Sequence, residues 1–263
     1  MQPTCRHLIL LPMFLIGASS PPVLAASELF DHEPWADVLR RFVDEQGLVD
    51  YAGLAADRAS LDRYLAAIES TSPKSHPQLF PTLEHQLAYY INAYNALVFQ
   101  GVLDLGPDAT TVWGKLGTGY GFFVKTKVVL GGRRTNLRKL ENQDIRKGFE
   151  DPRIHAALNC ASAGCPRLPQ EVFAAESLDQ QLDAAMAEFV ADARHCVVDS
   201  AAGTVSLSKI FDWFRSDFED FEALQGTSGN LMAYVNRYRV ADAQIPGDFK
   251  VRFLPYDKGL NHQ

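Results

Sequence analysis

One long apolar segment constrains the fold of this chain more than any other feature: residues 83–103, LEHQLAYYINAYNALVFQGVL. Apolar side chains fall on nearly every side of this segment when it is drawn as a helix, so no solvent-facing stripe is left. Such a helix has to be covered on all sides. We therefore expect a helix that begins near Thr82 and forms the buried centre of the fold.

Two amides interrupt this apolar segment, at Asn92 and Asn95. A buried amide costs stability unless its hydrogen bonds are satisfied. The expected role of each is to tie the central helix to a neighbouring loop, the NCAS turn at residues 159–162 being one candidate. The functional alternative places Asn92 or Asn95 beside Cys160 in a pocket.

The rest of the chain alternates amphipathic helices with short hairpins. A hairpin turn is expected at Gly131-Gly132, and a second hairpin around the AAG turn that precedes Thr204. A helix should begin at Ser206 or Ser208, both good N-cap residues. Further helices are expected at 34–51, 54–71, 179–194 and 231–240, and a closing strand at 251–257. The pattern predicts an α+β fold, mainly helical, with a small and mostly antiparallel sheet.

The first 25 residues are typical of a secretory signal. Arg6 precedes an apolar run of about eleven residues, which is too short to span a bilayer, and small residues surround a cleavage point after Ala25. We expect a periplasmic or secreted protein in three parts. These are the signal peptide (1–25), an N-terminal helical segment packed on the main domain (26–80) and the main domain (81–263).

The exported chain is acidic, since loss of Arg6 takes the formal net charge from −7 to −8. An acidic chain without a cluster of lysine and arginine argues against nucleic acids and anionic membrane surfaces as partners. We also expect no membrane span and no cofactor, because phosphate- and dinucleotide-binding motifs are missing from the sequence. A small molecule or a peptide is the expected substrate, and the sequence does not indicate an oligomeric state.

The segment RIHAALNCASAGCP places His155, Cys160 and Cys165 within fourteen residues. Three chemistries fit this spacing: a disulfide, a metal site or an activated thiol. The exported chain keeps Cys196 as a third cysteine, and an oxidising compartment favours pairing of two of the three; all three pairings stay open. A metal site would need His195 or Cys196 as its fourth ligand, and the C-x2-C spacing of most zinc sites is absent, so we expect no metal.

The activated-thiol interpretation centres on Cys160. A nucleophilic cysteine needs a lowered pKa, which a helix N-terminus or a neighbouring imidazole supplies. Whether residues 151–159 form a short helix or a strand, His155 and Asn159 should point together toward the turn that carries Cys160. The small residues that follow let backbone N–H groups converge near the sulfur as an oxyanion pocket. Cys165 precedes a proline, which favours extended backbone, so Cys160 is the expected reactive thiol.

Two other segments bear on the site. The glycine-rich segment GTGYGF, residues 117–122, is expected to be a flexible loop that acts as a pocket lid. Core packing is the expected role of five aromatic residues further along: Phe211, Trp213, Phe214, Phe218 and Phe221.

Four segments, in order, resemble the DUF547 family, a widespread domain of unknown function. They are AYYINAYNALV, RIHAALNCASAGCPRL, VSLSKIFDWFRSDF and FLPYDKGLN, and the resemblance extends over residues 82–261. It implies a fold similar to papain-like cysteine hydrolases. The matching residues whose importance it implies are Asn92, Tyr94, Asn95, Glu141, His155, Asn159, Cys160, Ser162, Cys165, Pro166, Asp257 and Asn261. Two positions depart from the family pattern: Asn142 replaces a frequent histidine, and Lys258 a frequent tryptophan.

The sequence supports two functions of different classes. The first is a cysteine-dependent hydrolase or acyl transferase that acts on a peptide, an amide or a small thiol peptide. Cys160 would be its nucleophile and His155 its base, with the imidazole oriented by one of four residues: Asn159, Asn95, Glu141 or Asp257. The second is a non-catalytic exported binding domain in which the same motif is a structural turn or a disulfide loop.

Overall fold

The computed structural model describes residues 29–114, 117–227 and 229–263. The expected signal peptide, residues 1–25, lies outside the described residues. Among the described helices, none combines the length and apolarity that crossing a bilayer requires.

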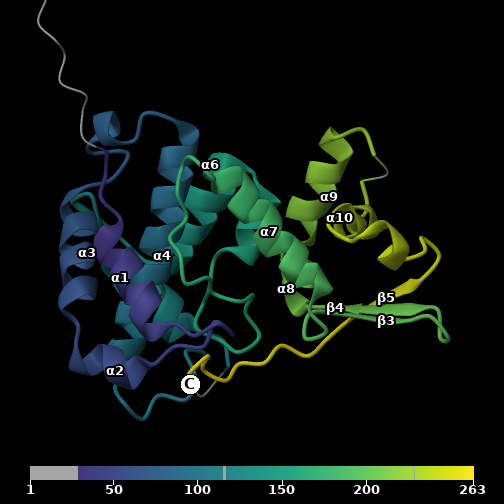
Figure 1. Cartoon of the computed structure of the whole chain (residues 1–263), viewed down its shortest axis with the longest axis horizontal. Helices are drawn as coiled ribbons and strands as arrows, with labels where there is room; N and C mark the ends of the chain where they lie inside the picture. The colour runs from purple at the N-terminus through teal and green to yellow at the C-terminus, as the bar shows by residue number, and fades with distance from the viewer. Residues whose placement is uncertain (1–28, 115–116, 228) are drawn as a thin grey trace, which may run out of the picture.

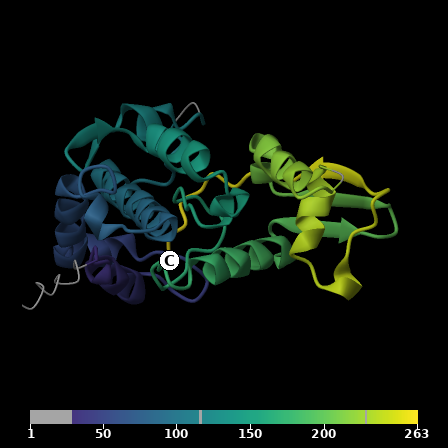
Figure 2. The same cartoon turned by 90° about the horizontal axis from the view of Figure 1, so that it is seen from above.

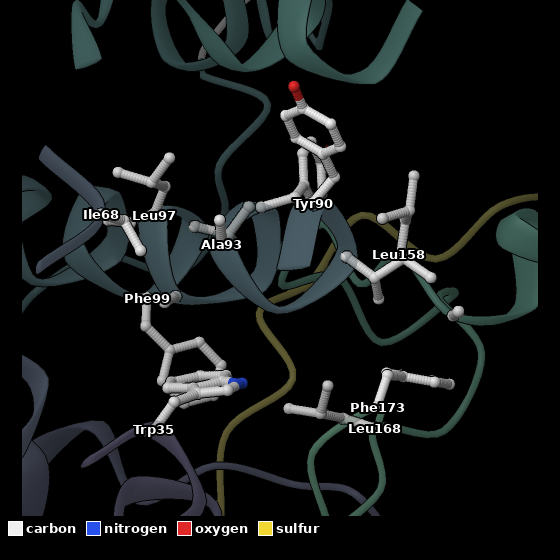
Figure 3. Close-up of a cluster of buried hydrophobic side chains, with 14 of the residues drawn as sticks. Trp35, Ile68, Tyr90, Ala93, Leu97, Phe99, Leu158, Leu168 and Phe173 are labelled. Carbon is white, nitrogen blue, oxygen red and sulfur yellow. The ribbon is translucent and has the colours of Figure 1, made fainter. Parts of the chain in front are cut away.

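Helix α4 (Leu83–Leu105) is the centre of the fold, as predicted. The Thr82 side chain accepts a hydrogen bond from the backbone N–H of His85 and so caps its start. The helix stops at Gly106, whose φ of 89° lies in the left-handed region that glycine tolerates best. Figure 3 shows large side chains on several sides of the helix, with Trp35 and Phe173 among them. The all-round apolar pattern is explained by this enclosure.

The N-terminal helices share one apolar core with α4. They are α1 (Glu33–Phe42), α2 (Tyr51–Ala56) and α3 (Ala59–Ser70), followed by the short 3₁₀-helix η1 (Pro77–Leu79). The expected continuous helix over 34–51 is wrong beyond Phe42. The Asp44 carboxylate accepts from the backbone N–H groups of Gln46 and Leu48, and Gly47 has a φ of 79°, so the chain turns there.

The predicted hairpin at Gly131-Gly132 is confirmed. Strand β1 (Val128–Leu130) pairs antiparallel with β2 (Arg133–Thr135), and Gly131 and Gly132 have φ values of 56° and 75°. Positive φ at both central residues is the geometry of a tight two-residue hairpin loop. Short helical segments flank the hairpin: the π-helices η2 (Gly121–Lys125) and η3 (Leu140–Arg146) and the helical turns α5 (Leu137–Lys139) and α6 (Lys147–Phe149).

The C-terminal half surrounds a second apolar core. Strand β3 (Cys196–Asp199) pairs antiparallel with β4 (Thr204–Leu207), which confirms the second hairpin, and β5 (Lys250–Phe253) adds in parallel to β4. Its helices are α7 (Leu178–Ala191), α8 (Lys209–Trp213), α9 (Arg215–Leu224) and α10 (Leu231–Arg237), with the 3₁₀-helices η4 (Pro152–Ala156) and η5 (Ala241–Ala243). The Ser208 side chain caps α8, as expected.

The fold is therefore α+β and mainly helical, with two small, mostly antiparallel sheets, as predicted. Figures 1 and 2 show helix α7 reaching from the first group of helices toward the second, and the C-terminal tail running back in the opposite direction from β5. The tail makes isolated bridges at its end, Leu260 with Ser162 and His262 with Val49. The tail, which begins at β5 beside the second core, therefore contacts both the cysteine loop and Val49 of the first core.

Candidate functional site

A cavity of about 410 Å³ lies between the two cores. Its size is that of a small-molecule site. Much of its wall is aromatic, with Trp113, Phe123, Trp213, Phe214 and Tyr256 among the lining residues. Polar and reactive groups also line it: Arg138, Glu141, Asn142, His155, Cys160 and Cys165.

Hydrogen bonds from two asparagines shape the cysteine loop. The Asn159 side chain accepts from the backbone N–H of Ala161 (2.8 Å) and donates to the carbonyl of Pro166 (3.0 Å), so it spans both ends of the loop. Asn95 accepts from the backbone N–H of Asn159 (2.9 Å) and donates to the carbonyl of Ala157 (3.0 Å). Helix α4 therefore fixes the loop, which is the scaffold role expected of Asn95.

The C-terminal tail holds the loop from the other side. The N–H of Ala163 donates to the carbonyl of Gly259 (2.8 Å), and that of Gly164 to the carbonyl of Asp257 (3.0 Å). A Cβ on Gly164 would lie 2.9 Å from the backbone of Asp257, so only glycine permits this approach. The Asp257 side chain is exposed and accepts from the N–H of Gly259. It is the preceding residue, Tyr256, that faces the cavity.

The two loop sulfurs are in direct contact. The Sγ atoms of Cys160 and Cys165 are 2.8 Å apart, and the Tyr256 hydroxyl lies 3.2 Å from each. The Ser162 hydroxyl is 3.5 Å from the Cys160 sulfur. Trp113 donates its indole N–H to the oxygen of Ser162 (2.7 Å), and the neutral Cys160 thiol donates to the same oxygen. Once Cys160 is ionised, the Ser162 hydroxyl can donate back to it, so three hydroxyl or thiol groups can donate to the Cys160 thiolate.

The environment divides the two thiols into a more acidic and a less acidic one. Hydrogen bonding from Cys165, together with Ser162 and Tyr256, lowers the pKa of Cys160, although burial and the charge of Glu141 oppose this. Burial raises the pKa of Cys165 well above its usual range. Cys160 is half-buried, whereas Cys165 is 4% exposed. The more exposed cysteine residue is thus the one that ionises first.

The imidazole of His155 has a partner that the sequence did not indicate. Its Nε2 donates to Oδ2 of Asp217 (2.8 Å), Arg146 donates twice to the same carboxylate (2.8 Å each), and the ring of Phe214 stacks on the imidazole with centroids 4.0 Å apart. Burial lowers the pKa of His155 despite Asp217. Burial opposes ionisation of Asp217, but hydrogen bonds from His155 and Arg146 hold its pKa well below the usual value. The lowered pKa favours the neutral imidazole near pH 7, and the Asp217 carboxylate favours the tautomer with its proton on Nε2, which leaves Nδ1 as the basic atom.

The structure brings Cys160 and His155 to one cavity without joining them. Within the described residues, the side-chain hydrogen bonds of the Cys160 sulfur go to Ser162, Cys165 and Tyr256. The expected direct thiol–imidazole contact is not formed. Asp217, which was not among the four expected residues, orients the imidazole.

The expected oxyanion pocket of loop N–H groups is also not formed. The N–H of Cys160 donates to the Cys165 sulfur (3.1 Å), that of Ala161 to Asn159, and those of Ala163 and Gly164 to the tail. These groups are already used to hold the loop in shape. The Tyr256 hydroxyl contacts the Cys160 sulfur instead and can donate to it.

Glu141 is a buried carboxyl in the same cavity. Its Oε2 accepts a hydrogen bond from the Tyr94 hydroxyl (3.2 Å), and burial raises its pKa despite that hydrogen bond. Glu141 is therefore a titratable group facing the cavity, and not the partner of His155.

Three other expected residues have structural positions. Asn92 donates to the carbonyl of Phe173 (2.8 Å) and accepts from its N–H (3.1 Å), so it ties α4 to that loop. Asn261 accepts from the Tyr51 hydroxyl (3.0 Å). Ser162 contacts the Cys160 sulfur, as described above.

The glycine-rich segment and one of the five aromatic residues, Trp213, differ from expectation. Thr118, Gly119 and Tyr120 line the cavity, but the chain becomes π-helical from Gly121 instead of continuing as a loop. Trp213 lines the cavity and is 43% exposed. The other four aromatic residues belong to the second core or pack against it, as predicted, and one of them, Phe214, lines the cavity as well. Aromatic residues at helical spacing are typical of a core, so these cavity positions have no separate signal in the sequence.

The cysteine motif does not gather metal ligands. In the described ranges, no group of three histidine, cysteine or acidic side chains has the arrangement to hold a metal ion. The candidates for a fourth ligand do not line the cavity. Cys196 is close to Arg239 (3.5 Å), and His195 contacts the ring of Phe189 and hydrogen-bonds to the backbone of Cys165.

Removal of the Asn95 side chain tests the scaffold role described above. We expect Asn95→Ala to lower the free energy of unfolding by about 1–3 kcal/mol, because a buried N–H and a buried carbonyl lose their partners. Denaturant unfolding of the variant and the parent measures this difference. An unchanged free energy of unfolding would show that Asn95 does not hold the loop.

A comparison with known protein families matches a region that contains part of the site. Residues 80–190 match the family model DUF547, described as a protein of unknown function. This range includes α4, η3 and the cysteine loop, but not Asp217 or Tyr256. No curated protein and no solved structure matches the chain significantly.

Proposed function

Because residues 80–190 form a DUF547 domain, a domain of unknown function, we propose a function from the geometry of the site: a cysteine-dependent hydrolase or acyl transferase with Cys160 as the nucleophile. One observation carries the proposal. The Cys160 sulfur lines a cavity of small-molecule size and is surrounded by three groups that stabilise its thiolate.

His155 is the proposed base, acting across the cavity. Its Nδ1 would take the Cys160 proton through a water or a substrate group between them, and Asp217 would stabilise the imidazolium. The thiolate then attacks the substrate carbonyl carbon, and the imidazolium protonates the departing amine or alcohol. Water or a second acceptor releases the acyl group from the sulfur. The Tyr256 hydroxyl is placed to donate to the oxyanion.

The cavity favours a small amide or peptide fragment. Its volume of about 410 Å³ excludes a folded protein, and rings such as Trp113 and Trp213 provide faces for a planar or apolar acyl group. Arg138 adds one positive charge to the lining, which suits a substrate carboxylate. A small thiol peptide combines a small size with a carboxylate, so it would also suit this cavity.

An acyl-transfer test uses p-nitrophenyl acetate as a generic acyl donor. We expect a burst of p-nitrophenol and an acetyl group on the peptide that contains Cys160, found by mass spectrometry after acid quenching. Cys160→Ala should lack both, whereas Cys196→Ala is the matched control and should behave as the parent. Acetylation spread over other residues, or a burst that survives in Cys160→Ala, would refute the nucleophile assignment.

We further propose that the protein is exported, on the basis of its N-terminal sequence. Protein recovered from the periplasm or the medium should then begin at Ala26, or one residue later. N-terminal sequencing by mass spectrometry checks this. Soluble protein that keeps Met1 would contradict it.

A further inference from the structure

We propose that Cys160 and Cys165 form a thiol–disulfide exchange pair that reduces small disulfides entering the cavity and is itself oxidised to an intramolecular disulfide. This activity goes beyond the proposed acyl transfer. It uses the same sulfur atom but does not require that Cys160 attack a carbonyl.

The two sulfur atoms already lie close enough to react with each other. Both are free thiols, and their Sγ atoms are 2.8 Å apart. The loop between them is held in this shape by Asn159, which bonds both of its ends, and by the C-terminal tail. Ala161 has a φ of 63°, an uncommon conformation for a residue other than glycine. Bond formation between the sulfurs therefore needs only a small movement in a loop that is already ordered.

Cys160 and Cys165 differ in burial and in the ease with which they ionise. Both cysteines line the cavity, but Cys160 is the less buried residue of the two, so we expect an incoming disulfide to meet it first. Cys165 is nearly inaccessible from outside but touches Cys160 directly. The ionisation order agrees with this, because the pKa of Cys160 is lowered by its hydrogen bonds and that of Cys165 is raised by burial. Cys160 is thus the attacking thiol and Cys165 the resolving thiol.

The size and the aromatic lining of the cavity suit a small disulfide. At about 410 Å³ it admits a low-molecular-weight disulfide, and its aromatic walls suit sulfur, which makes favourable contacts with rings. The Tyr256 hydroxyl lies 3.2 Å from both Sγ atoms, so it can donate to whichever sulfur carries the negative charge during exchange.

The reaction balances with a small disulfide RSSR as the oxidant. The Cys160 thiolate attacks one sulfur of RSSR, the S–S bond breaks, and RS⁻ leaves while Cys160 carries a mixed disulfide. The Cys165 thiol then gives up its proton to a leaving thiolate, and its sulfur attacks Cys160 Sγ. The second RS⁻ departs and is protonated. Two electrons and two thiol hydrogens pass from the protein to RSSR, which becomes two RSH.

The third described cysteine serves as a matched control. Cys196 is buried in β3, near Arg239, and does not line the cavity. It should take no part in the exchange. Of the three pairings that the sequence left open, the geometry thus favours the one between Cys160 and Cys165.

The experiment treats reduced parent protein with excess glutathione disulfide, followed by acid quenching and peptide mass spectrometry. We expect a Cys160–Cys165 disulfide and release of two reduced glutathione molecules per protein. Cys165→Ala should instead retain glutathione on Cys160 and release one, Cys160→Ala should not react at Cys165, and Cys196→Ala should match the parent. Cys165→Ser replaces Cys165→Ala where the latter unfolds.

A parent protein that keeps both thiols under these conditions overturns the proposal, as does a mixed disulfide on Cys160 that Cys165 never resolves. A linkage to Cys196 does so too. The p-nitrophenyl acetate assay on the same reduced samples separates the two proposals. A p-nitrophenol burst without reduction of glutathione disulfide would contradict only the exchange proposal. Reduction of glutathione disulfide without a burst would contradict only the acyl-transfer proposal.

Discussion

His155→Ala should slow acylation of Cys160 by p-nitrophenyl acetate by about 10²–10⁴-fold, the range expected for loss of a general base. The reason is that His155, which is hydrogen-bonded to Asp217, is the proposed base for the Cys160 proton. Stopped-flow measurement of the p-nitrophenol burst gives the rate. The rates of the parent and the variant should differ far less at high pH, where Cys160 ionises without help.

His155 also stacks on Phe214, so a control has to separate chemistry from folding. His155→Gln keeps an N–H for Asp217 but has no basic nitrogen, and it should acylate as slowly as His155→Ala. His262→Ala, at an exposed position of the tail, is the matched surface control. A His155→Gln protein that acylates as fast as the parent would remove His155 from the mechanism.

Acid should destabilise the fold strongly between about pH 6.5 and pH 4. Burial lowers the pKa of His32 and of His195 to about 4 in each case, and lowers that of His155 as well. A histidine whose folded-state pKa lies below its unfolded value stabilises the fold above the unfolded pKa, and this stability is lost as the pH falls. His32 and His195 should each contribute a loss of about 3 kcal/mol at pH 4, from 1.4 kcal/mol per pKa unit.

Denaturant unfolding at several pH values measures this loss. His195→Gln should remove about half of the combined loss of stability attributed to His32 and His195. A free energy of unfolding that stays constant from pH 6.5 to pH 4 would contradict the burial of these imidazoles.

The features that sequence reasoning predicted are those set by local chemistry. Helix α4 followed from a run of apolar residues, the β1–β2 turn from two adjacent glycines, and the start of α8 from the capping side chain of Ser208. Each depends on residues within a few positions of one another, so the pattern is visible in the chain itself. The end of α1 was wrong because the turn made by Asp44 and Gly47 outweighed the helical spacing.

The partners within the site were not predictable in the same way. Asp217 is 62 positions from His155, and Tyr256 is 96 positions from Cys160. Both meet the motif because α9 and the C-terminal tail pack against it from the second core, and that packing has no local signal. The likeness to papain-like hydrolases that the family resemblance implies, and the division of the chain at residue 80, stay predictions.

The central claim is that Cys160 is the activated thiol of the protein. The most direct test is the rate at which each cysteine of the fully reduced protein reacts with iodoacetamide at about pH 6.5, well below the usual cysteine pKa. Peptide mass spectrometry reads the rate at each position.

Cys160 should be labelled first and Cys165 and Cys196 much later. Tyr256→Phe should slow the labelling of Cys160, because it removes a hydroxyl donor from the thiolate, and His155→Gln should slow it as well, because it removes the proposed base. Labelling of Cys160 no faster than that of Cys196 would contradict the claim.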